Sequence, residues 1–132
     1  MREIKFRVFN KNAKCYIMHL GEKETSIAIF DLVSFSEYLT RNNIKNIDFF
    51  EIQLYTSLKD KNGKEIYEGD ICVYFVYDYV QDDTPLIDTR TLEVSYFRGC
   101  FWLGEFPLHS LPENIEVIGN IFENEDLLNG RK

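Results

Sequence analysis

Glu65, Glu68 and Asp70 are spaced closely enough in this sequence to do chemistry together. Such a group of carboxylates could hold a divalent cation or act as an acid/base pair. Isolated acidic clusters are more often solvated surface, because charged side chains are mostly exposed. We therefore predict neither catalytic residues nor a metal site among them.

The histidines and cysteines do not form a chelating or nucleophilic set. His19 and His109 lie far apart, and neither has a second His or a Cys at metal-ligand spacing. Cys15, Cys72 and Cys100 contain no Cys-x-x-Cys pair, and the hydrophobic residues around them favour packed thiols over nucleophiles. The chain also lacks a Gly-x-Ser-x-Gly elbow and an amide-rich phosphate loop. We predict no enzymatic activity and no cofactor.

Four aromatic residues are the candidates for an interaction surface. Protein interfaces use aromatic anchors because a ring buries a large area, and Tyr74, Tyr77, Tyr79 and Trp102 could supply them. The same residues could instead belong to the hydrophobic core, or stack against nucleic-acid bases. The sequence leaves these roles open.

The formal net charge of −7 restricts the class of partner. Phosphate backbones and anionic membranes repel an acidic protein at long range, so nucleic acid and membranes are disfavoured. The charge is also uneven. Residues 1–23 carry six Lys or Arg against two Glu, whereas residues 65–132 carry four against fourteen Asp or Glu. This asymmetry fits either a solvated surface whose two ends attract weakly or head-to-tail association between copies.

Length and composition predict a single β-rich domain over residues 1–132. This length is close to the commonest domain size, and 45% hydrophobic with 28% charged residues is typical of a folded protein. An aromatic content of 15% favours sheet. The N-terminus alternates charged and apolar residues where a signal peptide would be apolar, and the cysteines are odd in number. We therefore expect a cytoplasmic protein.

Two-residue alternation predicts most of the strands. Ile4, Phe6 and Val8 alternate with charged residues, so residues 2–20 are expected to form a β-hairpin with Arg7 on its solvated face. Residues 71–80 alternate strictly and predict the longest strand, and residues 81–90 are expected to form an exposed acidic loop. Further strands are expected at residues 26–30, 47–55, 92–97, 100–103 and 115–121, with a tight turn at residues 98–99.

Glycine and asparagine mark the turns. Asn62 with Gly63, and Gly69 with Asp70, predict two reversals of the chain, because these residues tolerate positive φ. Gly119 is expected to form a further turn that interrupts the last strand. These positions have an architectural rather than a catalytic interpretation.

One helix is predicted. Ser34 and Glu37 have the spacing of a capping box, and Asn42 is a suitable terminator, so a short helix is expected around residues 35–42. Asn124 is expected to cap a short C-terminal helical turn. The fold class is therefore β-rich α+β, with short antiparallel strands forming a small barrel-like or sandwich-like domain.

Three segments resemble the YopX family, and they occur in family order. They are Met-Arg-Glu-Ile-Lys-Phe-Arg at residues 1–7, Gln-Leu-Tyr-Thr with Lys-Asp-Lys-Asn-Gly-Lys-Glu-Ile-Tyr-Glu-Gly-Asp-Ile at residues 53–56 and 59–71, and Glu-Val-Ile-Gly-Asn-Ile-Phe-Glu-Asn at residues 116–124. The central segment is the most specific. Ser57 stands where the family usually has Gly, and Phe122 where it usually has Tyr. The resemblance implies a β-rich fold and an origin in a phage or prophage, and it supplies no catalytic residue.

Two hypotheses about function follow. The first is an uncharacterised phage or prophage accessory protein of the host cytoplasm that acts through protein contacts, with itself as a homo-oligomer and with a host or phage protein. The second is a small nucleic-acid-binding β-barrel, in which the aromatic residues stack on bases as they do in OB-folds. The acidic charge favours the first hypothesis.

Overall fold

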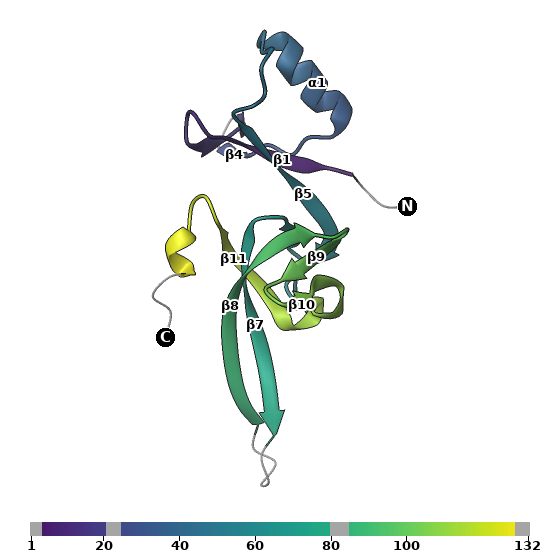
Figure 1. The fold of residues 1–132 in the computed structure, drawn as a ribbon, viewed down its shortest axis with the longest axis vertical. Coiled ribbons are helices and arrows are strands. Elements are labelled where there is room, and N and C mark those ends of the chain that lie inside the picture. The colour runs from purple at the N-terminus through teal and green to yellow at the C-terminus, as the bar shows by residue number, and fades with distance from the viewer. Residues whose placement is uncertain (1–3, 21–24, 80–84, 129–132) are drawn as a thin grey trace. The chain divides into compact units, whose positions relative to one another are not determined.

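The computed structural model describes residues 4–20, 25–79 and 85–128, and the chain divides into two compact units, Met1–Tyr55 and Thr56–Lys132. The boundary falls inside strand β5 (Phe50–Lys59) (Figure 1). The expected β-rich fold is confirmed, since the strands pair antiparallel and one sheet curls into a half-barrel. The organisation as one domain over residues 1–132 stays a prediction.

The first unit is built around strand β1. Its elements are, in chain order, β1 (Phe6–Asn10), β2 (Cys15–Tyr16), β3 (Met18–Leu20), β4 (Thr25–Ile27), α1 (Leu32–Arg41) and the start of β5. β1 lies between β2 and β5, and it pairs with β5 from Phe6 opposite Leu54 to Asn10 opposite Phe50. The hairpin predicted for residues 2–20 is therefore confirmed for β1 and β2 only. β3 pairs with β4 instead.

Helix α1 begins earlier than predicted. Asp31 is its N-cap, and the Asp31 carboxylate accepts a hydrogen bond from the Ser34 amide while the Ser34 hydroxyl accepts one from the Asp31 amide. The capping box is thus present, but Ser34 is its N3 residue and not its N-cap, so the predicted start at residue 35 was wrong. The predicted terminator is confirmed, because Asn42 is the C-cap and its side-chain amide donates to the Tyr38 carbonyl.

Phe35 anchors this helix to the sheet. It is the buried residue of α1, and its ring lies edge-on to Phe6 at 5.4 Å and to Phe30 at 5.2 Å between centroids. These rings join Val8 and Phe50 in the buried core of the first unit. A helix of ten residues is marginal alone, so these aromatic contacts are what stabilise it.

Arg7 does not lie on a solvated face, and that prediction was wrong. Its side chain is 7% exposed, and its Nε donates to the Gln53 side-chain oxygen at 2.7 Å. The Tyr16 hydroxyl donates to the same oxygen at 2.7 Å, and the guanidinium lies over the Tyr16 ring. Both faces of the β1–β5 pair are therefore covered, one by the aromatic core and one by this polar network.

The second unit contains a five-stranded antiparallel sheet in the order β10-β9-β8-β7-β11. Its elements are the end of β5, β6 (Glu65–Tyr67), β7 (Asp70–Tyr79), β8 (Pro85–Phe97), β9 (Cys100–Leu103), β10 (Phe106–Pro107), the 3-10 turns Leu108–Ser110 and Pro112–Asn114, β11 (Ile115–Asn120) and the 3-10 turn Glu125–Leu127. Ile66, Cys72, Val94, Leu103 and Ile115 are completely buried in its core.

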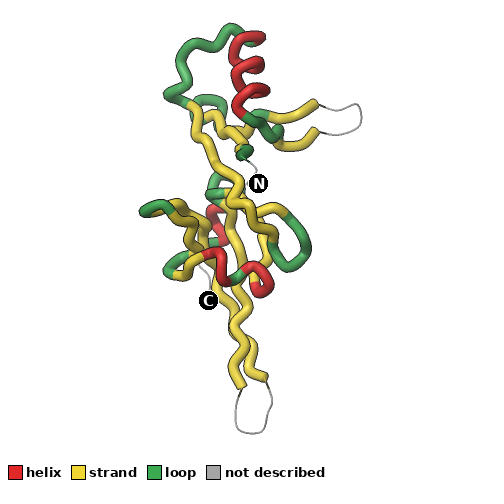
Figure 2. Tube along the Cα trace, turned by 90° about the vertical axis from the view of Figure 1, so that its right-hand side faces the viewer, coloured by secondary structure: helices red, strands yellow, loops and turns green. Residues whose placement is uncertain are grey.

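β7 and β8 form a two-stranded ribbon that extends beyond the neighbouring strands of the sheet. They pair from Ile71 opposite Glu93 to Tyr79 opposite Pro85, whereas β11 pairs with β7 no further than Tyr74. Figure 2 shows the ribbon extending beyond the rest of this unit's strands. Residues 85–90 were predicted to be part of an acidic loop, which was wrong, because they belong to strand β8 and pair with β7. β8 is accordingly longer than β7.

The predicted turns are mostly where the glycines place them. Gly63 has φ +84° and Gly69 has φ +87°, so both adopt the left-handed conformation that suits glycine. Gly119 is not in a turn. It lies inside β11 at an irregularity in the register with β7, where an added Cβ would come 2.5 Å from the Asn124 side chain. The expected C-terminal turn is present with Asn124 at its N-cap position, but the Asn124 side-chain oxygen accepts from the Asn120 amide and makes no capping hydrogen bond.

Gly63→Val should lower the free energy of unfolding by about 1 to 2 kcal/mol, because a β-branched residue is strained at positive φ. No atom lies within 4 Å of the position that a Cβ would take, so the cost is one of backbone conformation alone. Gly63→Asn is the matched control, since Asn tolerates this conformation, and it should cost clearly less. Urea denaturation measures both, and equal losses would contradict the assignment.

Candidate interaction surface

Asp60 is a buried carboxylate of the second unit that accepts three backbone hydrogen bonds. One of its oxygens accepts hydrogen bonds from the amides of Asn62 at 2.8 Å and Lys64 at 2.9 Å, and the other accepts from the Val117 amide at 2.9 Å. The backbone also closes this turn, because the Gly63 amide donates to the Asp60 carbonyl. Asp60 therefore joins the turn of residues 60–64 to strand β11.

These contacts set the protonation of Asp60. Burial by itself would raise the pKa of the carboxyl, but the three amides, with the charge of Lys64, lower the pKa below its usual value. The folded state thus stabilises the carboxylate form. Three backbone amides hold the carboxylate, so Asp60 has a structural role in this turn.

The acidic cluster that the sequence singled out is also engaged internally. The Asp70 carboxylate accepts from the Tyr67 amide at 2.7 Å, and Glu65 accepts from the Tyr67 hydroxyl at 3.0 Å. Across residues 4–20, 25–79 and 85–128, no three His, Cys, Asp or Glu side chains are grouped as metal ligands. Asp70 organises the reversal at Gly69 that leads into β7.

The cysteines differ in environment. Cys72 is completely buried, and burial, with the charges of Asp70 and Asp60, raises the pKa of its thiol. A thiol that resists ionisation is a poor nucleophile. Cys15 and Cys100 are free and exposed, so the expectation of packed thiols holds for Cys72 alone.

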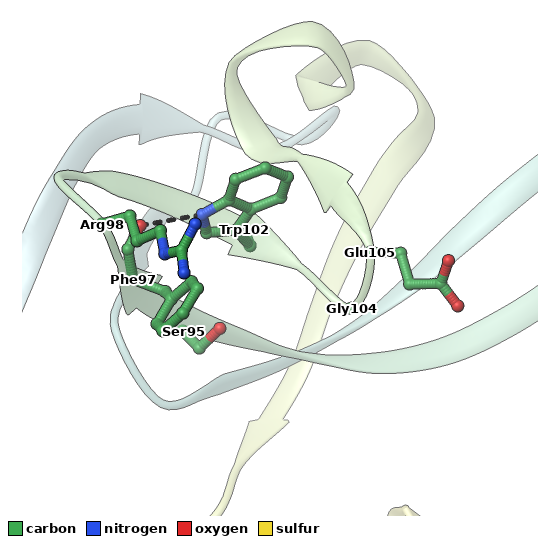
Figure 3. Close-up of a pocket in the computed structure, with 6 residues that line it drawn as sticks. All are labelled: Ser95, Phe97, Arg98, Trp102, Gly104 and Glu105. Carbon is green, nitrogen blue, oxygen red and sulfur yellow. Dashed lines mark hydrogen bonds between the residues drawn. The ribbon is translucent and has the colours of Figure 1, made fainter.

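An open hollow of about 400 Å³ lies on the β8–β9 hairpin, and it is the candidate surface. The hollow is lined by Ser95, Phe97, Arg98, Trp102, Gly104 and Glu105 (Figure 3). Ser95 and Trp102 are directly opposite each other in the ladder, and Phe97 shares their face because strand side chains alternate. The neighbouring pair, Val94 and Leu103, points the other way and is buried in the core. The hollow is therefore on the face of the hairpin turned away from the core.

Aromatic side chains dominate this surface. Phe97 is 58% exposed, and Trp102 is half-buried with its indole N–H donating to the Phe97 carbonyl at 3.0 Å. The indole donor is therefore already used within the hairpin, and the ring face is what remains for a partner. The Arg98 guanidinium lies 5.2 Å from the centroid of the Phe97 ring.

The structure separates the four predicted aromatic residues. Trp102 lines the hollow, whereas Tyr74 is half-buried against the core and lies edge-on to Phe106 at 5.3 Å. The backbones of Tyr77 and Tyr79 pair within the ribbon, but their side chains lie outside the described residues. Of the two whose side chains are described, Trp102 lines the hollow and Tyr74 does not.

The sequence-based reasoning missed Phe97, Arg98 and Glu105 as surface residues. A signal for Phe97 was available, because a two-residue turn at residues 98–99 fixes the register on either side. That register places Phe97 opposite Cys100 and Ser95 opposite Trp102. Glu105 carried no comparable signal, since it comes to the hollow only through the second turn, at residues 104–105.

Comparison with known proteins identifies the family. A family model described as YopX protein matches residues 5–129. The chain belongs to the YopX family. The crystal structure of protein EF1440 from Enterococcus faecalis is similar, with 23% sequence identity, a TM-score of 0.57, and coverage of 98% of this chain and 100% of that chain. At this identity the likeness shows the fold. No curated protein matches.

The segments that resembled the YopX family are the ones that pair with each other. Arg7 of the opening segment pairs with Gln53 at the start of the central one. Asp70, near the end of the central segment, pairs with Asn120 of the closing segment. The shared residues therefore hold strands together, which agrees with their architectural interpretation.

The described part of the chain contains no helix of sufficient length and apolar character to cross a membrane.

The departure from the YopX pattern at Ser57 falls on a strained position. Ser57 has φ +73°, a conformation that costs a non-glycine residue about 1 to 2 kcal/mol. Ser57→Gly should therefore raise the free energy of unfolding by about 0.5 kcal/mol or more, after the extra freedom of glycine in the unfolded chain is allowed for. Chemical denaturation measures the change. Ser57→Ala, which keeps the strain, is the control and should give no gain.

Asp60→Asn should lower the free energy of unfolding at neutral pH by about 1 to 3 kcal/mol, because the amide cannot accept all three N–H donors. Since the folded state lowers the pKa of Asp60, its contribution is present above the unfolded value near 3.8 and is lost as the pH falls through the folded value. The difference between wild type and variant should therefore shrink below about pH 4. Asp48→Asn, at an exposed position, is the control. A difference that is constant from pH 7 to about pH 3 would contradict this account.

Proposed function

We propose that this YopX-family chain is a non-enzymatic accessory protein of a phage or prophage, which acts in the host cytoplasm through protein–protein contacts. Its partners are a second copy of the chain and a host or phage protein. The observation that carries the proposal is the exposed aromatic face of the β8–β9 hairpin, where Phe97 is 58% exposed beside the half-buried Trp102.

Burial against a partner is the physical reason that such a surface associates. Covering apolar area contributes roughly 25 cal/mol per Å², so an exposed Phe beside a half-buried Trp gains free energy from any complementary partner. The hairpin also supplies rigidity. The two-residue turn and the indole hydrogen bond to the Phe97 carbonyl hold these rings in place, which lowers the entropic cost of binding.

A nucleic-acid-binding role is the second candidate, and one observation favours it. Arg98 lies beside two aromatic rings, which is a combination that stacks on bases and contacts phosphate. The charge opposes it, because residues 65–132 carry fourteen acidic residues against four basic ones. Stacking contributes about 1 to 3 kcal/mol per base, and one site of this kind does not offset such repulsion. Protein contacts are therefore the stronger proposal.

Sedimentation velocity and light scattering over a range of concentrations test the proposal. Wild type should self-associate at micromolar concentration, and Phe97→Ser should weaken this association about tenfold or more, because it removes the most exposed ring of the hairpin. Leu32→Ser is the matched control. Leu32 is 71% exposed on helix α1, so its removal deletes a comparable apolar side chain that belongs to the first unit and not to the hairpin. A larger effect of Leu32→Ser would place the contact elsewhere.

The nucleic-acid alternative is tested in parallel. The protein should not retard single-stranded or double-stranded DNA at about 150 mM salt. A monomer that retards DNA under these conditions would reverse the order of the two proposals. A pull-down from prophage-bearing cells, with Phe97→Ser as the comparison, should recover a protein partner through the wild type alone.

A further inference from the structure

The hollow on the β8–β9 hairpin carries one positive and one negative charge, at opposite ends of an aromatic floor. Arg98 stands at the end formed by the first turn, and Glu105 stands at the end formed by the second (Figure 3). The Glu105 side chain points away from Trp102, and the Arg98 guanidinium stays beside the Phe97 ring. Both charged residues are exposed.

Residues 98–105 have corresponding residue types when counted inward from their two ends, with opposite charges at the ends. Strand β9 (Cys100–Leu103) is flanked by glycines at 99 and 104, and outside these stand Arg98 and Glu105. Placed antiparallel to a copy of itself, the segment brings Arg98 opposite Glu105 and Gly99 opposite Gly104 at both ends. The glycines leave no side chain at the positions next to the charges. A surface of this kind is complementary to itself under a two-fold rotation.

We infer that two copies of the chain pair face to face through this hollow, about a two-fold axis near Trp102, with Arg98 of each copy bound to Glu105 of the other. The inference deepens the proposed self-association and rests on it. The Phe97 and Trp102 rings of the two copies are then buried at the centre, and the charge pairs form the rim. This is the usual arrangement of an interface, with an apolar core and a polar border.

The backbone at Arg98 supports a role for its side chain outside the turn. Arg98 and Gly99 have φ +53° and +80°, so they form a hairpin turn that needs positive φ at both central residues. Gly, Asn or Asp suits the first of these positions, whereas Arg is strained there. The turn therefore gives no reason for an arginine. An ion pair across the interface does explain the arginine. Its guanidinium can stack on the Phe97 ring and bind a carboxylate at the same time.

The inferred interface is small, and this sets its strength and its stoichiometry. A face of one hairpin is well below the roughly 800 Å² per partner of a stable complex, so we expect a dissociation constant in the micromolar range. A two-fold interface also closes on itself. The assembly should stop at a dimer, in contrast to the open-ended growth that head-to-tail pairing of the basic and acidic segments would allow.

Charge reversal provides the test. In Arg98→Glu, both rim pairs become Glu against Glu, and in Glu105→Arg both become Arg against Arg. Each variant alone should dimerise about tenfold or more weakly than wild type. An equimolar mixture of the two should form a one-to-one dimer, because every rim pair then joins opposite charges. Sedimentation velocity, with one variant carrying a fluorescent label, distinguishes the mixed dimer from the homodimers.

The outcomes separate this inference from the proposed function. If both reversal variants dimerise as wild type does, self-association stands and the pairing through the hollow is overturned. If each is monomeric and their mixture is also monomeric, the two-fold register is overturned. A wild type that stays monomeric would overturn the proposed self-association itself.

Arg98→Gly keeps the experiment interpretable if a reversal variant does not fold. Glycine relieves the strain at φ +53°, so this variant should be at least as stable as wild type while its dimer is several-fold weaker. The free energy of unfolding should then stay the same or rise, while the affinity of the dimer falls. An Arg98→Gly dimer as tight as that of wild type would overturn the assigned role of Arg98.

Discussion

The carboxylate of Asp60 is the constraint on which the second unit depends. It takes up three amides, two in the turn that follows it and one in strand β11, which is 57 residues further along the chain. Its partner in β11, Val117, stands beside the irregularity in the β7 ladder, so the carboxylate satisfies an amide where the register shifts. The Asp60 carboxylate thus couples a local turn to the closure of the sheet, because buried amides need an acceptor wherever the ladder does not supply one.

The first unit also contains buried polar groups, and side-chain hydrogen bonds satisfy them. Its core is a cluster of phenylalanines around Phe35, and the opposite face of the β1–β5 pair holds Arg7, Tyr16 and Gln53 in one hydrogen-bonded network. The Gln53 oxygen accepts from both partners. A buried guanidinium is tolerated because its Nε donates to the Gln53 oxygen and its charged face lies against the Tyr16 ring. The aromatic contacts and this network together explain how a short sheet supports a ten-residue helix.

The β8–β9 hairpin connects this architecture to the proposed activity. One of its faces supplies Val94 and Leu103 to the core of the second unit, and the core holds the hairpin rigid. The other face presents Phe97 and Trp102, whose rings lie outside that core. Function on such a surface depends on the tight turns at either end, since they set the spacing of the two charged residues that border the rings.

Local pattern determined much of this protein. Alternation at Phe6 and Val8 predicted β1, the Asn42 terminator ended the helix where expected, and Gly63 and Gly69 adopt the conformations that their residue type favours. The resemblance in three segments also pointed to the family that the comparison confirms. Each of these features depends on neighbours within a few residues, which is why the sequence alone was sufficient for them.

Tertiary contacts decided the rest. Ser34 could cap a helix as well as Asp31 could, and in the folded chain Asp31 takes the cap while Phe35 packs on Phe6 and Phe30. Arg7 has the spacing of a solvated residue, but Gln53 and Tyr16 come from other strands to bury it. Glu105 reaches the hollow because β10 pairs back on β9. In each case the free energy comes from groups that are distant in sequence, and local propensity carries no information about which of them will meet.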